Sequence, residues 1–249
     1  MARIVSLLTM LACWQAGAGI AGPRLLPAPM AVGAAMLAEA RSGALFANLG
    51  ATLARVIAAF VIAMAIGSAL GLWMGRSRLA DRLADPWLVV LLNLPALVII
   101  VLAYIWGGLT ETAAIAAVAL NKLPSATVTL REGARALDPK LDDLAHVFSF
   151  SRATWLRHVA APQLAPYFAA AARAGLSLVW KIVLVVELIG RPNGVGFEIG
   201  SAFQLFDVTR ILAYSLAFVA VMLAIEIFLV QPFEQHAARW RPSSSRRQN

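Results

Sequence analysis

The chain has 249 residues, of which 61% are hydrophobic and 14% charged, and its formal net charge is +8. A soluble domain is typically about 45–50% apolar and about 25% charged, so this composition and the mean hydropathy of +0.77 argue against a cytosolic enzyme or a disordered protein. The single cysteine, Cys13, leaves no intrachain disulfide to form, which argues against a disulfide-rich secreted domain.

The excess of basic residues has a simpler explanation than nucleic-acid binding. Membrane proteins of the bacterial type collect Lys and Arg on cytoplasmic loops. The chain has neither a zinc-ligand spacing nor basic residues interleaved with aromatic ones. We therefore expect a lipid bilayer around the chain and no nucleic-acid partner.

Apolar stretches of transmembrane length recur along the chain and predict an all-α polytopic membrane protein with about six spans, each needing roughly 20 residues. The candidate spans are residues 4–21, 56–75, 87–106, 112–130, 166–189 and 211–230. The small residues at 16–22 would also suit a cleaved signal peptide, but the charge distribution favours a retained first span.

Three regions follow from this pattern. Residues 1–47 hold the first span and a proline-rich segment outside the cytoplasm, and residues 48–230 form a core domain with five spans. Residues 231–249 form a basic tail. With the N-terminus in the cytoplasm, thirteen Lys and Arg residues fall on the inner side and four on the outer side. The positive-inside rule therefore predicts a bacterial inner-membrane protein with both termini in the cytoplasm.

The longest cytoplasmic connector, residues 131–165, contains an amphipathic helix over residues 138–148. Asp138 is a typical N-cap and Pro139 suits the first helical position. One apolar face is formed by Leu141, Leu144, Ala145 and Phe148, which recur at helical spacing. Asp142 and Asp143 would be repelled by an anionic membrane surface. A groove on a partner protein therefore suits this helix better than the lipid surface.

This connector resembles the EAA loop of ABC importer permeases. Asp143, Leu144 and Ala145 stand in the E-A-A place, Ser149 in the place of the glycine, and Pro162 in the L-P place. The resemblance continues outside the loop, where further segments are similar to nitrate/sulfonate/taurine-type permeases. These segments are residues 25–29, 67–75, 105–107 and 191–199.

The resemblance implies the type I ABC importer permease fold. It also implies the partners: a cytoplasmic ABC ATPase dimer, a second permease subunit, expected to be a second copy of this chain, and a periplasmic solute-binding protein. The residues expected to couple to the ATPase are Leu141, Asp143, Leu144, Ala145, Phe148, Ser149 and Pro162. The solute expected by resemblance is a sulfonate, taurine, nitrate or a similar anion, and a pyrimidine-type vitamin precursor is the alternative.

No phosphate-binding loop of the G-x-x-x-x-G-K-[ST] type occurs in the sequence. ATP-Mg is therefore expected on the partner ATPase, and this chain is expected to bind no cofactor or metal and to hold no catalytic residue. A membrane protease is disfavoured, because Ser177 lies in a span while the three histidines lie in cytoplasmic segments. A stand-alone secondary transporter would leave the capped cytoplasmic helix unexplained.

Polar residues and prolines within the spans are candidates for the solute pathway or its gate. Charged groups in hydrocarbon usually face protein or a water-filled path, which singles out Lys181 and Glu187. They lie too far apart along the helix to pair directly, so structural pairing with other helices is the alternative. Asn93 and Pro95 predict a bend in the third span.

A stripe of small residues marks the second span. Gly67, Gly71 and Gly75 recur every four residues, which places them on one face of a helix. Such stripes let two helices approach closely in a membrane. We expect this face to pack within the subunit, with a contact between subunits as the alternative.

Overall fold

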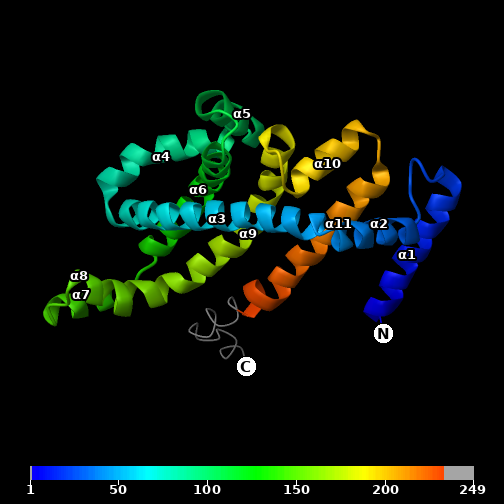
Figure 1. Ribbon diagram of the computed structural model, residues 1–249. Coiled ribbons are helices and arrows are strands. Elements are labelled where there is room, and N and C mark those ends of the chain that lie inside the picture. Colours follow the sequence, from blue (N-terminus) through cyan, green and yellow to red (C-terminus); the bar gives the residue numbers. More distant parts are fainter. Residues whose placement is uncertain (1, 233–249) are drawn as a thin grey trace.

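The computed structural model describes residues 2–232, and within that range the regular structure is entirely helical. The helices, coloured along the chain in Figure 1, are α1 (Ala2–Ala21), α2 (Pro29–Arg41), α3 (Ala44–Arg76), α4 (Arg78–Asn93), α5 (Ala96–Gly107), α6 (Glu111–Arg135), α7 (Pro139–Val147), α8 (Arg152–Trp155), η1 (Leu156–Ala160), α9 (Ala161–Gly190), α10 (Val195–Gln204), α11 (Val208–Ile225) and η2 (Glu226–Val230). The predicted all-α polytopic fold is confirmed. Most of the predicted tail, residues 231–249, lies outside the described residues.

Four helical stretches in the described part of the chain are long and apolar enough to cross a membrane: Ala44–Arg76, Glu111–Arg135, Arg152–Gly190 and Val208–Val230. The predicted first span corresponds to α1, whose apolar part, Val5–Ala21, is shorter than these four. A fifth span arises if α4 and α5 are taken together. The structure therefore offers four or five clear spans where about six were expected.

The predicted span over residues 87–106 is not one straight helix. It divides into the end of α4 and all of α5, which meet at an angle of 99°. Pro95 has no amide hydrogen to donate and pushes the residue before it out of the helical region. Leu94 accordingly has an extended backbone, with φ −72° and ψ 128°. Asn93 and Pro95 thus lie at the bend that the sequence predicted.

The core is built around the packing of α3 on α6. The glycine stripe of α3 faces α6 within the same subunit: a Cβ atom added to Gly71 would lie 2.6 Å from the carbonyl oxygen of Thr127, and one added to Gly75 would lie 2.5 Å from the Cβ of Ala134. Helix α9 completes this central layer, where buried Val179 and Val183 pack with Val56 and Ile100.

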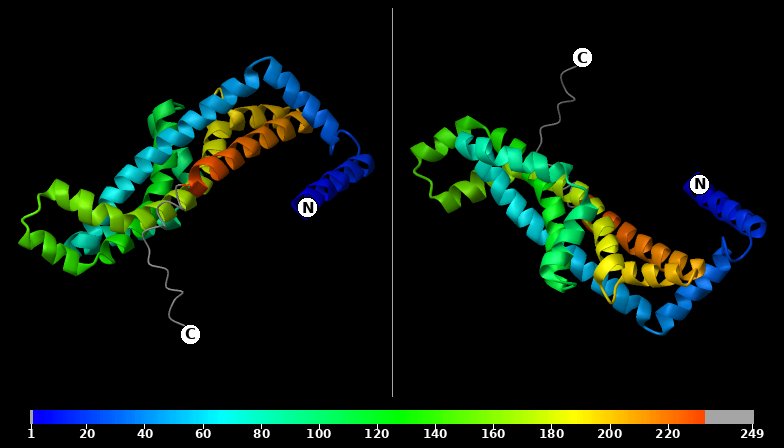
Figure 2. Two further views of the ribbon diagram at one scale, coloured as in Figure 1. Left: turned by 90° about the horizontal axis from the view of Figure 1, so that it is seen from below. Right: turned by 90° about the horizontal axis from the view of Figure 1, so that it is seen from above.

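The molecule has two distinct ends. Helix α7 and helix α8, which begins the long stretch Arg152–Gly190, lie at one end, while α1, α2 and α10 lie at the opposite end (Figures 1 and 2). Helix α10 lies in the connector between the predicted spans 166–189 and 211–230, where the sequence analysis predicted no helix. A cluster of buried side chains from α3, α10 and α11, including Leu49, Val195 and Phe218, closes this end of the fold.

Candidate functional site

Helix α7 begins at the predicted residue. The side chain of Asp138 accepts a hydrogen bond of 2.9 Å from the backbone N–H of Lys140, and Pro139 occupies the first helical position. The backbone N–H of Asp138 donates to Oε1 of Gln163, also at 2.9 Å. This second bond ties the start of α7 to the first turn of α9, in which Pro162 lies exposed.

Helix α7 ends in a left-handed turn at Ser149. The φ angle of Ser149 is +51°, a conformation that glycine adopts far more readily than serine. The backbone N–H of Phe150 donates to the carbonyl of Ala145 at 2.9 Å, and that of Ser149 donates to the carbonyl of His146 at 3.0 Å. These bonds form a Schellman-type end, which explains why the family pattern has glycine at this position.

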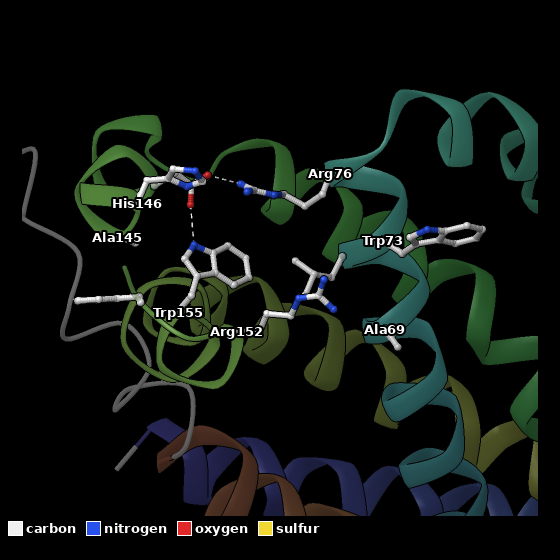
Figure 3. Close-up of a pocket in the computed structure, with 10 residues that line it drawn as sticks. Ala69, Trp73, Arg76, Ala145, His146, Arg152 and Trp155 are labelled. Atoms are coloured by element: carbon white, nitrogen blue, oxygen red, sulfur yellow. Dashed lines mark hydrogen bonds and ion pairs between the residues drawn. The ribbon is translucent and has the colours of Figure 1, made fainter. Parts of the chain in front are cut away.

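The inner face of α7 is anchored to α3 and α8 through Asp142. One carboxylate oxygen of Asp142 accepts from the guanidinium of Arg76, and the other accepts from Nε1 of Trp155 at 2.7 Å (Figure 3). The Arg76 guanidinium also lies 5.0 Å from the centre of the Trp155 ring. Burial alone would raise the pKa of Asp142, but the hydrogen bonds from Arg76 and Trp155 outweigh it and hold the pKa below the usual value.

The outer face of α7 is apolar and open. Leu144 is 50% exposed and Phe148, the C-cap, is 67% exposed, and Leu141 is also exposed. Ala145 is only 5% exposed, so it lies on the inner side of the helix with Asp142. Asp143 is exposed. The structure therefore leaves three of the four residues of the predicted apolar face available to a partner, and it uses Ala145 for packing within the subunit.

A second constellation, of which the sequence reasoning singled out only Glu187, is a buried charge cluster at the opposite end of the fold. Nη1 of Arg55 on α3 lies 2.7 Å from the carboxylate of Glu187 on α9, and these side chains are 5% and 0% exposed. Arg55 also donates to both carboxylate oxygens of Glu111 and to the backbone carbonyl of Asn193. The signal was available, because Arg55 borders one predicted span and Glu187, of opposite charge, lies within another.

This cluster holds the first turn of α10, whose N–H groups have no partners within the helix. Glu187 accepts from the N–H of Gly196 at 2.8 Å, and Thr52 Oγ1 accepts from the N–H of Val195 at 2.8 Å. Asn48 accepts from the N–H of Gly194 at 2.8 Å. The hydroxyl of Thr52 itself donates to Glu187 at 2.9 Å.

The contacts of Glu187 agree with the alternative interpretation from the sequence, structural pairing with another helix. Its carboxylate is fully buried within the subunit and accepts from donors on α3 and α10. Lys181 does not join it. Lys181 is exposed, and its ammonium lies 5.8 Å from the ring of Trp180. Asn93 is exposed and donates to the carbonyl of Val89 at 2.7 Å.

Within residues 2–232, a helical bundle of four or five spans with a short helical hairpin at one end defines a multi-pass membrane protein. Residues 63–231 match the family described as the binding-protein-dependent transport system inner membrane component, and the chain belongs to this family. It is thus a permease subunit of the ABC importer class, a transport subunit of the inner membrane.

Individual relatives extend the likeness along the chain. The chain is 30% identical over 236 residues to SsuC of Escherichia coli (strain K12), named as an aliphatic sulfonates transport permease protein, covering 94% of this chain and 89% of the relative. It is 30% identical over 241 residues to the riboflavin transport system permease protein RibX of Chloroflexus aurantiacus, covering 96% and 90%. The crystal structure of an amino acid ABC transporter with histidines has the same fold, with a TM-score of 0.64, 20% identity and coverage of 81% and 98%.

Proposed function

We propose that this chain forms, with a second copy of itself, the membrane pathway for a small organic anion of the aliphatic sulfonate class. A periplasmic binding protein delivers the solute, and a separate cytoplasmic ATPase, which binds ATP-Mg, supplies the energy. The observation that carries the proposal is α7, a capped helix that is anchored to the permease on one face and exposes Leu144 and Phe148 on the other.

The contacts of α7 support a role as a rigid lever. Its N-terminus is bonded to α9 through Gln163, its inner face to α3 and α8 through Asp142, and its C-terminus is closed by the turn at Ser149. An apolar face seated in a groove of the ATPase gives affinity. When the two ATPase subunits close, they move α7. The bonds of α7 to α3 and α9 pass this movement to two membrane spans.

The charge distribution supports an orientation with α7 in the cytoplasm. Arg131 and Arg135 at the end of α6 pair with Asp81 of α4 at 3.2 and 2.5 Å. Arg76 lies at the same end of the fold, beside α7. The positive-inside rule assigns such an accumulation of arginines to the cytoplasmic side, and the same rule then puts both termini in the cytoplasm.

The choice of a sulfonate rests on the relatives. The SsuC relatives of Escherichia coli and Bacillus subtilis and the taurine permease TauC all carry names for sulfonate solutes. The name of another relative, the riboflavin permease of Chloroflexus aurantiacus, points to a vitamin instead. A direct comparison of radiolabelled ethanesulfonate, taurine and riboflavin in one uptake assay distinguishes these solutes.

The test uses vesicles that contain the permease with the ATPase and binding protein that co-purify with it from the native host. We expect Leu144→Asp to abolish ATP-driven sulfonate uptake and to release the ATPase, because a charge then lies in the apolar contact. Leu144→Met, which keeps the apolar volume, is expected to retain both. Unchanged uptake by Leu144→Asp would refute docking through α7. Uptake driven by an ion gradient without the ATPase would establish a secondary transporter instead.

A further inference from the structure

A pocket of about 740 Å³ lies between the end of α3 and the α7–α8 hairpin. Its walls are largely apolar or aromatic and include Leu72 and Trp73 of α3 and Trp155 of α8, and the guanidinium groups of Arg76 and Arg152 border it (Figure 3). The pocket therefore combines an apolar wall that belongs to a membrane span with basic groups at the level where that span ends.

The charge of the pocket is positive. Arg76 is balanced by Asp142, whose two carboxylate oxygens are already occupied by Arg76 and Trp155. Arg152 is exposed and, within the described residues, has no carboxylate partner. Its side chain extends from α8 into the pocket toward α3 (Figure 3). The guanidinium of Arg152 is therefore available to bind an anion.

An apolar stripe leads from the pocket along α3 into the membrane. Ile62, Ile66, Ala69 and Trp73 recur at helical spacing, and all four side chains are exposed. In a membrane, such a face contacts acyl chains, and tryptophan is enriched at the depth of the headgroups. The stripe and the pocket together match an amphiphile with a negative headgroup and a hydrocarbon tail.

We propose that this pocket binds an anionic phospholipid of the leaflet on the α7 side. Arg152 contacts the headgroup phosphate, Trp73 lies at the glycerol level, and one acyl chain follows Ile62 and Ile66. Basic pockets between membrane helices on the cytoplasmic side are typical sites for anionic headgroups. The bound phosphate braces α8 against α3, next to the ion pair that anchors α7.

The position of α7 keeps this site separate from the proposed ATPase contact. Asp142 and Ala145 face inward and border the pocket, whereas Leu144 and Phe148 are exposed on the outer side of α7. An ATPase seated on the outer side leaves the opening toward the membrane free. The lipid site and the proposed ATPase contact therefore use different faces of α7.

The test is the retention of lipid by the purified full-length permease, measured by native mass spectrometry in a mild detergent. The protein is incubated with equal amounts of phosphatidylglycerol and phosphatidylcholine. We expect the wild type to retain phosphatidylglycerol preferentially and Arg152→Gln to lower that preference by about five-fold, the effect typical of one basic residue near an anionic surface. Arg157→Gln is the matched control, because Arg157 is an exposed arginine of the same helical stretch that does not border the pocket.

Three results would overturn the proposal. The first is an equal loss of preference in Arg152→Gln and Arg157→Gln, which indicates a general charge effect. The second is displacement of phosphatidylglycerol by an excess of glycerol 3-phosphate, which indicates a site for free anions. The third is loss of the lipid when the ATPase is added, which indicates that the ATPase covers the pocket. None of these readouts involves transport, so a failure here and a failure of the proposed function are distinguishable.

Discussion

At the scale of single residues, the α7 hairpin depends on two side chains with special backbone or charge requirements. Ser149 holds a left-handed conformation at the position where the family pattern has glycine. Asp142 connects α7 to Arg76 and Trp155. We expect both residues to determine how firmly α7 is held, and each can be tested without altering the exposed apolar face.

Ser149→Gly is expected to stabilise the end of α7. A non-glycine residue in the left-handed region costs about 1–2 kcal/mol, and the greater backbone freedom of glycine in the unfolded chain offsets roughly half of this. Amide hydrogen exchange in α7 is the measurement, and we expect slower exchange in the variant. Ser149→Val, with a β-branched side chain in the same conformation, is expected to exchange faster than the wild type. Equal rates in all three proteins would contradict the assigned backbone.

Asp142→Asn is expected to loosen α7, because the amide carries no charge to pair with Arg76. The pair is partly exposed, so the expected loss is only about 1 kcal/mol. Since the folded pKa of Asp142 is lowered, its contribution is complete above the ordinary carboxyl pKa of 3.8 and is lost as the pH falls through the folded value. Hydrogen exchange in α7 is compared between the wild type and Asp142→Asn at neutral pH and at pH 3. We expect the variant to exchange faster at neutral pH and the difference between the two proteins to be smaller at pH 3.

The control for that experiment is Asp143→Asn in the isolated permease. Asp143 is the exposed neighbour of Asp142 on α7 and lies outside the pocket against α3. Its removal is expected to leave exchange in α7 unchanged at either pH. Equal acceleration in both variants would mean that the net charge of the helix, rather than the bonds of Asp142, sets its stability.

At the scale of elements, the sequence predicted those features that depend on neighbouring residues. Asp138 and Pro139 placed the start of α7, and the proline at position 95 placed the bend between α4 and α5. Helix α10 was missed because its first turn is held by Asn48, Thr52 and Glu187, which lie far away in the sequence. The sequence also placed Ala145 on the apolar face offered to a partner, whereas Ala145 is buried on the same side of α7 as Asp142. That side is fixed by the bond from Arg76 to Asp142, and Arg76 lies 66 residues earlier.

The packing of α3 on α6 supplies a test at this scale. Gly71→Ala is expected to destabilise the permease by about 1–3 kcal/mol, because the added Cβ would lie 2.6 Å from the carbonyl of Thr127 and the helices must separate. Gly50→Ala, in the same helix, has open space around the added Cβ. It is expected to be neutral or stabilising, because alanine favours a helix by about 1 kcal/mol over glycine. Thermal unfolding in detergent compares the two, and equal destabilisation would refute close α3–α6 packing as the cause.

At the scale of the whole molecule, the two ends of the bundle carry different chemistry. The end with α7 collects arginines, an exposed apolar helix face and the pocket lined by Trp73 and Arg152. The other end is closed by the buried pair of Arg55 and Glu187, which secures α10. This division fits a transport subunit that receives force at one end and solute at the other. The hydropathy pattern predicted the spans and the positive-inside rule predicted their orientation, but neither could predict the pairing of Arg55 with Glu187, 132 residues apart.

The proposed orientation predicts that cysteines at the two ends of the bundle are labelled from opposite sides of the membrane. In a background in which Cys13 is replaced by Ser, a cysteine at Val147, which is 79% exposed on α7, is expected to react with a membrane-impermeant maleimide only in inverted vesicles. A cysteine at Phe206, 85% exposed after α10, is expected to react in intact cells. Labelling of both from the same side would contradict the proposed topology, because α7 and α10 lie at opposite ends of the bundle. If the cysteine at position 147 reacts in intact cells and the one at position 206 only in inverted vesicles, the topology is the reverse of the one proposed. Helix α7 would then lie out of reach of any cytoplasmic ATPase.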